Sequence, residues 1–126
     1  MNIPANLKYT KDHEWVSIDG DIATVGITDF AQKELGDIVY VEVETLDQTL
    51  AQDEVFGTVE AVKTVSDLFL PLSGEIIAFN DDLESSPETV NADPYGKAWM
   101  IKIKISNPSE IENLLSSDDY KNLIGA

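Results

Sequence analysis

One stretch of this chain carries its strongest structural signal: VFGTVEAVKTVSDLFLPLSGEIIAF, residues 55–79. Segments rich in β-branched and aromatic residues at 55–62 and 65–70 are typical of strands, and Lys63 lies between them. A proline and a glycine then interrupt the chain before a third apolar run at 75–79. This layout predicts a β-hairpin that carries Lys63 at its tip, with a further strand close behind it.

Further strand patterns lie on both sides of this stretch. Residues 13–27 are typical of two strands joined at Asp19-Gly20, a dipeptide that favours a tight hairpin turn. A β-branched and aromatic run predicts a strand at 38–43. Residues 99–105 alternate, so Trp99 is predicted to share a side with the isoleucines, opposite the lysines.

Short helices are predicted at the margins of the strands. They lie near 29–35, 110–115 and 118–124. Thr28 as the N-cap and Gly36 as the stop fit the first of them. Ser109 followed by Glu112 is a capping-box pattern for the second. Residues 80–97, with two prolines, are predicted to form an irregular surface loop.

Length and composition bound the fold and its partners. With 126 residues the chain is expected to be one domain, 1–126, and the patterns predict an all-β sandwich or flattened barrel with helical additions. The formal net charge of −16 argues against nucleic acid and anionic membranes, and it favours partners with basic docking faces. No apolar run near 20 residues predicts a membrane span.

The sequence offers no positive sign of a catalytic or metal centre. Cysteine is absent, and the lone histidine, His13, has no obvious nucleophile beside it, so packing or a structural hydrogen bond is its expected role. The acidic run at 81–84 lacks the glycine and spacing of a calcium loop. The chain is therefore expected not to be an enzyme.

Lys63 is the candidate for chemistry. A hairpin tip bears no packing load, so the lysine side chain would project freely. An amide bond from its ε-amine to a carboxylic acid would give a long arm on a firm base, able to visit several active sites. From the spacing alone, an ordinary exposed lysine remains the simpler interpretation.

The residues around Lys63 also resemble a known family. VEAVKTVSD, residues 59–67, looks like the lipoylation site of the glycine cleavage system H protein family. Other segments resemble that family in register along nearly the whole chain: Leu7–Val16, Val25–Asp29, Leu35–Asp37, Pro71–Glu75, Ser86–Pro87 through Val90–Asn91, Asp93–Gly96 and Trp99–Ile103.

The resemblance implies a lipoyl/biotinyl-type β-barrel sandwich with lipoate covalently attached to Lys63. It implies a carrier that shuttles the aminomethyl group of glycine between enzymes, while cofactors and partners do the chemistry. The implied partners are the pyridoxal-phosphate glycine decarboxylase (P protein), the tetrahydrofolate-dependent aminomethyltransferase (T protein), dihydrolipoyl dehydrogenase (L protein), which reoxidises the arm, and lipoate-attaching enzymes.

Four acidic residues receive roles from this resemblance. Glu14 and Asp67 match positions that hold the protonated amine of a parked arm in a surface cleft. Glu34 stands where some relatives carry histidine and is a further candidate for that cleft. Glu60 is a candidate for recognition of the hairpin by the attaching enzyme. For all four, solvated surface charge is the alternative.

Other carriers and other roles stay open. A biotinyl domain would want methionine on each side of Lys63, where Val62 and Thr64 stand, and a 2-oxoacid dehydrogenase domain would want Asp-Lys-Ala and a linker. A lipoyl relay or interaction protein that donates lipoate to other complexes would keep the same lysine. We expect a monomer, and the absence of a presequence favours a bacterial cytoplasm over a mitochondrial matrix.

Overall fold

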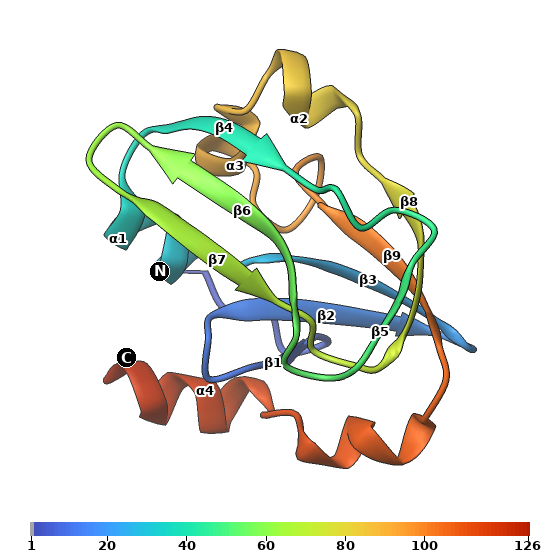
Figure 1. The fold of residues 1–126 in the computed structure, drawn as a ribbon. Helices are drawn as coiled ribbons and strands as arrows, with labels where there is room; N and C mark the ends of the chain where they lie inside the picture. The colour runs from blue at the N-terminus through green and yellow to red at the C-terminus, as the bar shows by residue number, and fades with distance from the viewer. Residues whose placement is uncertain (1) are drawn as a thin grey trace.

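The computed structural model describes residues 2–126, which form two antiparallel β-sheets packed against each other (Figure 1). The larger sheet has the strand order β1 (Lys8–Tyr9), β2 (Glu14–Asp19), β3 (Ile22–Ile27), β9 (Ile101–Ile105), β8 (Gly74–Phe79) and β5 (Thr49–Leu50). The smaller sheet has the order β4 (Ile38–Glu42), β6 (Val55–Ala61) and β7 (Val65–Phe69). The predicted mainly β fold is confirmed.

The hydrophobic core fills the space between the sheets. Successive strand residues point to opposite faces, so aligned residues such as Val16, Val25 and Ile101 all point inward from the larger sheet. Val59 and Leu68 enter the same cluster from the smaller sheet. Burial of such side chains stabilises the fold by roughly 25 cal/mol per Å² of apolar surface.

Two local predictions are confirmed in detail. The β2–β3 hairpin turns at Gly20, whose φ of 63° favours glycine. Helix α1 (Asp29–Leu35) begins where Thr28 accepts a hydrogen bond from Ala31 N (3.1 Å), and it ends at Gly36 with φ 84°. These residues position the start of β4, which runs beside the lysine hairpin.

The second predicted helix differs from expectation. Pro108–Asn113 is a 3₁₀ helix, η1, and it begins without a side-chain cap, so the capping box at Ser109 and Glu112 is wrong. The carboxylate of Glu110 instead accepts from the backbone N and the hydroxyl of Ser73 (2.7 and 2.8 Å). This long-range contact joins the C-terminal segment to the residue before β8, and the Ser109 hydroxyl donates to Oδ1 of Asn107 (2.6 Å).

The third predicted helix is confirmed as α4 (Ser117–Ile124). Ser116 caps it by accepting a hydrogen bond from Asp119 N (3.1 Å). Tyr120 on α4 is fully buried and stacks on Tyr9 of β1, with ring centroids 4.8 Å apart. This contact anchors the C-terminal helix beneath the larger sheet (Figure 1).

The segment 80–97 contains more regular structure than predicted. It holds two single-turn helices, α2 (Asp82–Ser85) and α3 (Thr89–Ala92). Each has one fully buried anchor, Leu83 in α2 and Val90 in α3, and these anchors hold the turns against the body of the protein. In the described part of the chain, every helix is too short and too polar to span a bilayer.

The prediction for Trp99 is wrong. Regular alternation begins only at Ile101, where β9 starts, so Trp99 does not share the inward side of the isoleucines. The half-buried Trp99 ring instead lies under the ammonium of Lys102, 5.1 Å from its centroid. The alternating pattern identified the strand and placed its start two residues too early.

Candidate functional site

Lys63 lies at the tip of the β6–β7 hairpin, where the sequence predicts it (Figure 1). A hydrogen bond from Ala61 N to Thr64 O (2.7 Å) closes the tip. Lys63 is exposed, and its neighbours Val62 and Val65 are 76% and 61% exposed. In the described part of the chain the Lys63 ammonium has no ion-pair partner, so the amine is open to an acyl donor.

The tip rests on a neighbouring corner of the chain. Val62 N donates to the carbonyl of Asp37 (3.1 Å), and Ala61 pairs with Ile38 at the start of β4. The side chain of Lys63 passes over Gly36, because a Cβ added to Gly36 would lie 3.7 Å from Cε of the lysine. The backbone at the base of Lys63 is therefore bonded to the corner at residues 36–38.

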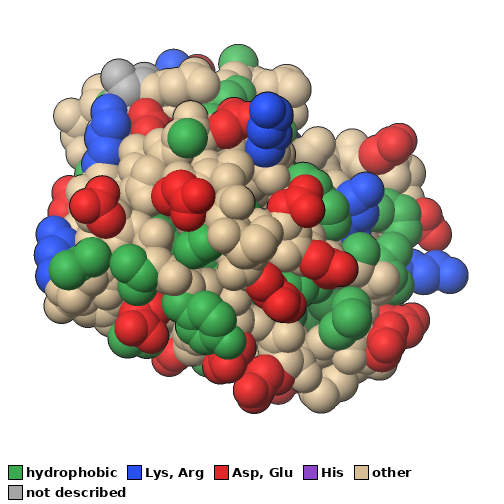
Figure 2. All heavy atoms as spheres, turned by 90° about the horizontal axis from the view of Figure 1, so that it is seen from above, with side chains coloured by type: hydrophobic (Ala, Val, Ile, Leu, Met, Phe, Trp, Pro, Cys, Tyr) green, Lys and Arg blue, Asp and Glu red, His purple; other side chains and the backbone are tan. Residues whose placement is uncertain are grey.

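Glu60 lies on the outer face of the smaller sheet. Strand pairing aligns it with Tyr40 of β4 on one side and Val65 of β7 on the other, and all three are exposed. Figure 2 shows acidic side chains spread over the face seen from above, with hydrophobic ones between them. Such a surface suits a partner that combines apolar contact with basic side chains.

A cavity of about 130 Å³ lies between α1 and β7. Two of the predicted cleft residues, Glu34 on α1 and Asp67 on β7, line it together with His13 and Ser66. Apolar side chains form the rest of its wall, among them Leu68. The structure therefore brings three carboxylates, those of Asp12, Glu34 and Asp67, to one small, partly apolar hollow on the side of the lysine hairpin.

Glu14 is not part of this lining. Its side chain is only 2% exposed, because it points into the protein from the end of β2. Oε1 accepts from the Thr10 hydroxyl (2.8 Å) and Oε2 accepts from Phe69 N (3.1 Å). Burial raises the pKa of Glu14 to about 8. Glu14 is thus a buried carboxyl that links the two sheets from within, and its predicted part in a cleft for the arm stays a prediction.

His13 has the structural role that its sequence context predicts. It adopts a φ of 70°, and its Nδ1 lies 2.9 Å from the hydroxyl of Tyr120. Its ring packs on Phe30, with centroids 4.9 Å apart. Burial lowers the pKa of His13, so the neutral ring is favoured. The Tyr120 hydroxyl also lies 2.8 Å from that of Thr28, which connects α4 to the N-terminus of α1.

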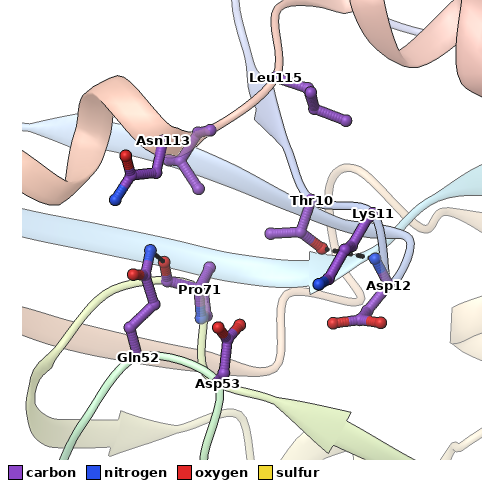
Figure 3. Close-up of a pocket in the computed structure, with 9 residues that line it drawn as sticks. Thr10, Lys11, Asp12, Gln52, Asp53, Pro71, Asn113 and Leu115 are labelled. Carbon is purple, nitrogen blue, oxygen red and sulfur yellow. Dashed lines mark hydrogen bonds between the residues drawn. The ribbon is translucent and has the colours of Figure 1, made fainter.

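A second hollow, of about 350 Å³, lies at the opposite end of β7 (Figure 3). Figure 3 shows Thr10, Lys11 and Asp12 on one side of it and Gln52, Pro71 and Asp53 on the other. Sequence reasoning missed this hollow because its walls come from segments far apart in the chain. Predicted site residues do not line it, although Thr10 on its wall also donates to the buried Glu14.

A two-sheet β scaffold that displays a lysine at a hairpin tip is the architecture of lipoyl- and biotinyl-type carrier domains. The family model described as "Glycine cleavage H-protein" matches residues 7–126. The chain is 54% identical over 126 residues to the glycine cleavage system H protein of Bacteroides fragilis, with 100% of both chains covered. It is 55% identical to that of Staphylococcus epidermidis, with 99% of each covered.

A solved structure agrees with these relatives. The crystal structure of a glycine cleavage system H protein from Mycobacterium marinum superposes with a TM-score of 0.90 at 37% identity, covering 98% of this chain and 100% of that one. The chain belongs to the glycine cleavage H-protein family.

Proposed function

We propose that residues 1–126 act as the lipoyl carrier of a glycine cleavage system, with lipoate amide-linked to Lys63. The observation that carries this proposal is the exposed amine of Lys63, which has no ion-pair partner among residues 2–126, on an anchored hairpin tip within a chain of this family. Acylation needs a primary amine that a second enzyme can reach, and the tip fits that need. When bound, lipoate supplies a dithiolane on a long arm that carries the aminomethyl group of glycine.

The chain's own contribution is to hold and present the arm, so we infer a non-catalytic subunit. Lys63 would anchor the arm, and the fixed tip would keep its base in one place while the end moves. The partners we propose are glycine decarboxylase, the aminomethyltransferase, dihydrolipoyl dehydrogenase and the enzymes that attach lipoate. The net charge of −16 supports docking to basic faces on them. The bacterial sources of the relatives support a cytoplasmic site of action.

The cavity between α1 and β7 is our candidate for sheltering the end of the arm. Glu34 and Asp67 would hold a protonated amine there by charge-assisted hydrogen bonds, and apolar wall residues would limit the access of water. Glu14 would act indirectly, because the hydrogen bond that it accepts from Phe69 N fixes the last residue of β7, the strand that carries Asp67. Glu60, three residues before Lys63 on the exposed face, would serve recognition by the attaching enzyme.

The test is lipoylation followed by glycine turnover. The purified chain is incubated with a lipoate-attaching enzyme, and its intact mass and peptides are measured. A lipoyl increment on Lys63 supports the proposal, and an unmodified lysine contradicts it. Glycine-dependent transfer is then assayed with the decarboxylase. Lipoylated protein that supports no transfer would favour the relay role over the carrier role.

A further inference from the structure

A half-buried carboxamide, Asn91 of α3, makes three hydrogen bonds next to the lysine hairpin. Its Oδ1 accepts from Ile38 N (2.9 Å). Its Nδ2 donates to the carbonyl of Gly36 and to Oε1 of Gln32, both at 2.9 Å. One acceptor and two donors are thus all in use, which is nearly the full capacity of an asparagine side chain.

These bonds hold the two peptide groups on either side of Asp37. Asn91 bonds to the residue before Asp37 and to the residue after it, much as a neighbouring strand would. Between the end of α1 at Leu35 and the start of β4 at Ile38, the other backbone contacts of the corner are the bond from Gly36 N to the carbonyl of Gln32 (2.9 Å) and the pairing of Ile38 with Ala61. Asn91 therefore sets where the carbonyl of Asp37 points.

The carbonyl of Asp37 is hydrogen-bonded to the hairpin tip that carries Lys63. It accepts the hydrogen bond from Val62 N (3.1 Å), the residue immediately before Lys63. The stem of Lys63 also passes over Gly36, whose own carbonyl Asn91 holds. A continuous path of hydrogen bonds thus runs from Asn91 through the corner to the base of the lysine.

We propose that Asn91 is a positioning residue for Lys63, acting through the corner at residues 36–38 to hold the hairpin tip in the conformation that an attaching enzyme binds. The inference rests on the proposed acylation of Lys63. A tip that spends only part of its time in the binding-competent conformation loses apparent affinity by that fraction, while the reaction after binding is unchanged. Loss of Asn91 should therefore raise KM for the carrier more than it lowers kcat.

The chain offers a matched control in Asn80, at the end of β8. Its carboxamide also makes three hydrogen bonds: it donates to the carbonyls of Lys97 and Trp99 and accepts from Asp82 N. The two asparagines thus share residue type, number of bonds and chain segment. They differ in that the partners of Asn80 do not contact the lysine hairpin through hydrogen bonds in the described residues.

The first measurement is amide hydrogen exchange in unmodified protein. Asn91→Asp keeps the acceptor for Ile38 N and loses both donors. We expect exchange of the Val62 amide, which opens locally, to speed up about tenfold, the size of one net hydrogen bond, while the amide of Val59 in mid-strand, which follows global stability, changes by the same factor in Asn91→Asp and in Asn80→Asp. Asn80→Asp should leave the Val62 amide unchanged at a similar loss of global stability. Equal exchange at Val62 in the two variants would overturn the proposal.

The second measurement is the kinetics of lipoylation by a lipoate-attaching enzyme. Asn91→Asp should raise KM about tenfold with kcat within about twofold of the parent, and Asn80→Asp should change neither. Acylation by a small succinimidyl ester, which needs no positioned tip, should proceed at the same rate in all three proteins. An unchanged KM in Asn91→Asp would count against Asn91.

The outcomes separate this inference from the carrier proposal. If the parent protein is not lipoylated, the carrier proposal fails, and the exchange of Val62 still decides whether Asn91 holds the tip. If Asn91→Asp does not fold, Gln32→Ala replaces it, since this change removes one acceptor from Asn91 together with the bond from Gln32 to Asp29 within α1. It should accelerate the Val62 amide in the same direction by a smaller factor, and parental exchange there would contradict the proposal.

Discussion

The two long hairpins of this protein have opposite kinds of tip. The β2–β3 hairpin turns on Asp19-Gly20, where a left-handed glycine allows a tight turn and open space surrounds it: a Cβ at Gly20 would meet nothing within 4 Å. The β6–β7 hairpin turns through residues 62–64 without a left-handed residue, and Val62 N bonds to the carbonyl of Asp37. One tip is shaped by its own sequence and the other by a neighbouring segment.

This difference indicates that a lysine presented to a partner enzyme needs a hairpin tip bonded to a second segment of the chain. A self-sufficient turn can move as a unit, whereas a tip bonded to a second segment keeps one position relative to the body of the protein. The hairpins are also linked at their open ends, because Glu14 of β2 accepts a hydrogen bond from the backbone of Phe69 in β7. The β6–β7 hairpin is thus bonded to other segments both at its tip and at its open end. In the described part of the chain, Gly20 at the turn of the β2–β3 hairpin has no such contact.

The largest expected effect is at the lysine itself. Lys63→Arg should abolish lipoylation completely, because a guanidinium cannot form the amide that a primary amine forms. The fold should be unchanged, with the free energy of unfolding within about 0.5 kcal/mol of the parent, since the tip is exposed. Intact mass and urea denaturation measure the two quantities. A variant that fails to fold would contradict the placement of the Lys63 side chain on the exposed surface of the tip.

The link between the hairpins should depend on pH. The pKa of Glu14 is raised from its ordinary value of 4.5 to about 8 by burial, so the native state keeps a proton that the unfolded state loses. The contribution of Glu14 to the free energy of unfolding should therefore fall as pH rises from about 4.5 to 8. The total decrease should be a few kcal/mol in order of magnitude, and the contribution should then level off.

Glu14→Gln provides the matched test of that link. The neutral side chain removes the titration, so the variant should resemble the parent near pH 4.5 and exceed its stability at pH 8. Urea denaturation across this pH range gives the difference between the two proteins, which isolates Glu14 from the other acids. Parallel pH profiles would show that Glu14 does not titrate in this window.

A change at the self-sufficient turn should have a moderate, local effect. Gly20→Ala places a side chain at φ 63°, which should lower the free energy of unfolding by about 1 kcal/mol. Gly20→Asn should recover most of that loss, because asparagine tolerates this conformation. Lipoylation rates of both variants should equal the parental rate. A slowed rate would mean that the two hairpins are not independent at their tips.

The smallest effect is expected at the exposed valines beside Lys63. Replacing Val62 and Val65 by serine should change the free energy of unfolding by no more than about 0.5 kcal/mol. Val59→Ser on the inward face of the same hairpin is the control and should lower it by more than about 2 kcal/mol, because Val59 is buried in the core. Similar losses in the two proteins would mean that the tip valines pack against other residues.

The sequence predicts those elements of the fold that depend on residues close together in the chain. The strands around Lys63, the turn at Gly20 and helix α1 with its cap at Thr28 all follow from residues that are neighbours in the chain. The capping box at Ser109 fails because the helix already starts at Pro108 and the Ser109 hydroxyl donates to Oδ1 of Asn107, while the neighbouring Glu110 bonds to the distant Ser73. Local patterns carry no information about such contacts.

The same limit applies to the site. That Lys63 is exposed follows from its place between two strands. The burial of Glu14 does not, since it depends on how β7 packs over β2. The bonds of Asn91 to the corner of the lysine hairpin join segments more than 50 residues apart. Where sheets and segments meet, the chemistry of individual side chains becomes apparent only in the folded protein.

The most direct test of the carrier account is peptide mapping after enzymatic lipoylation of the unmodified chain. The chain has eight lysines, which compete as acceptors under the same conditions. The account predicts a lipoyl group on the peptide that contains Lys63 and on no other. Modification spread over several lysines, or absent from Lys63, would contradict it.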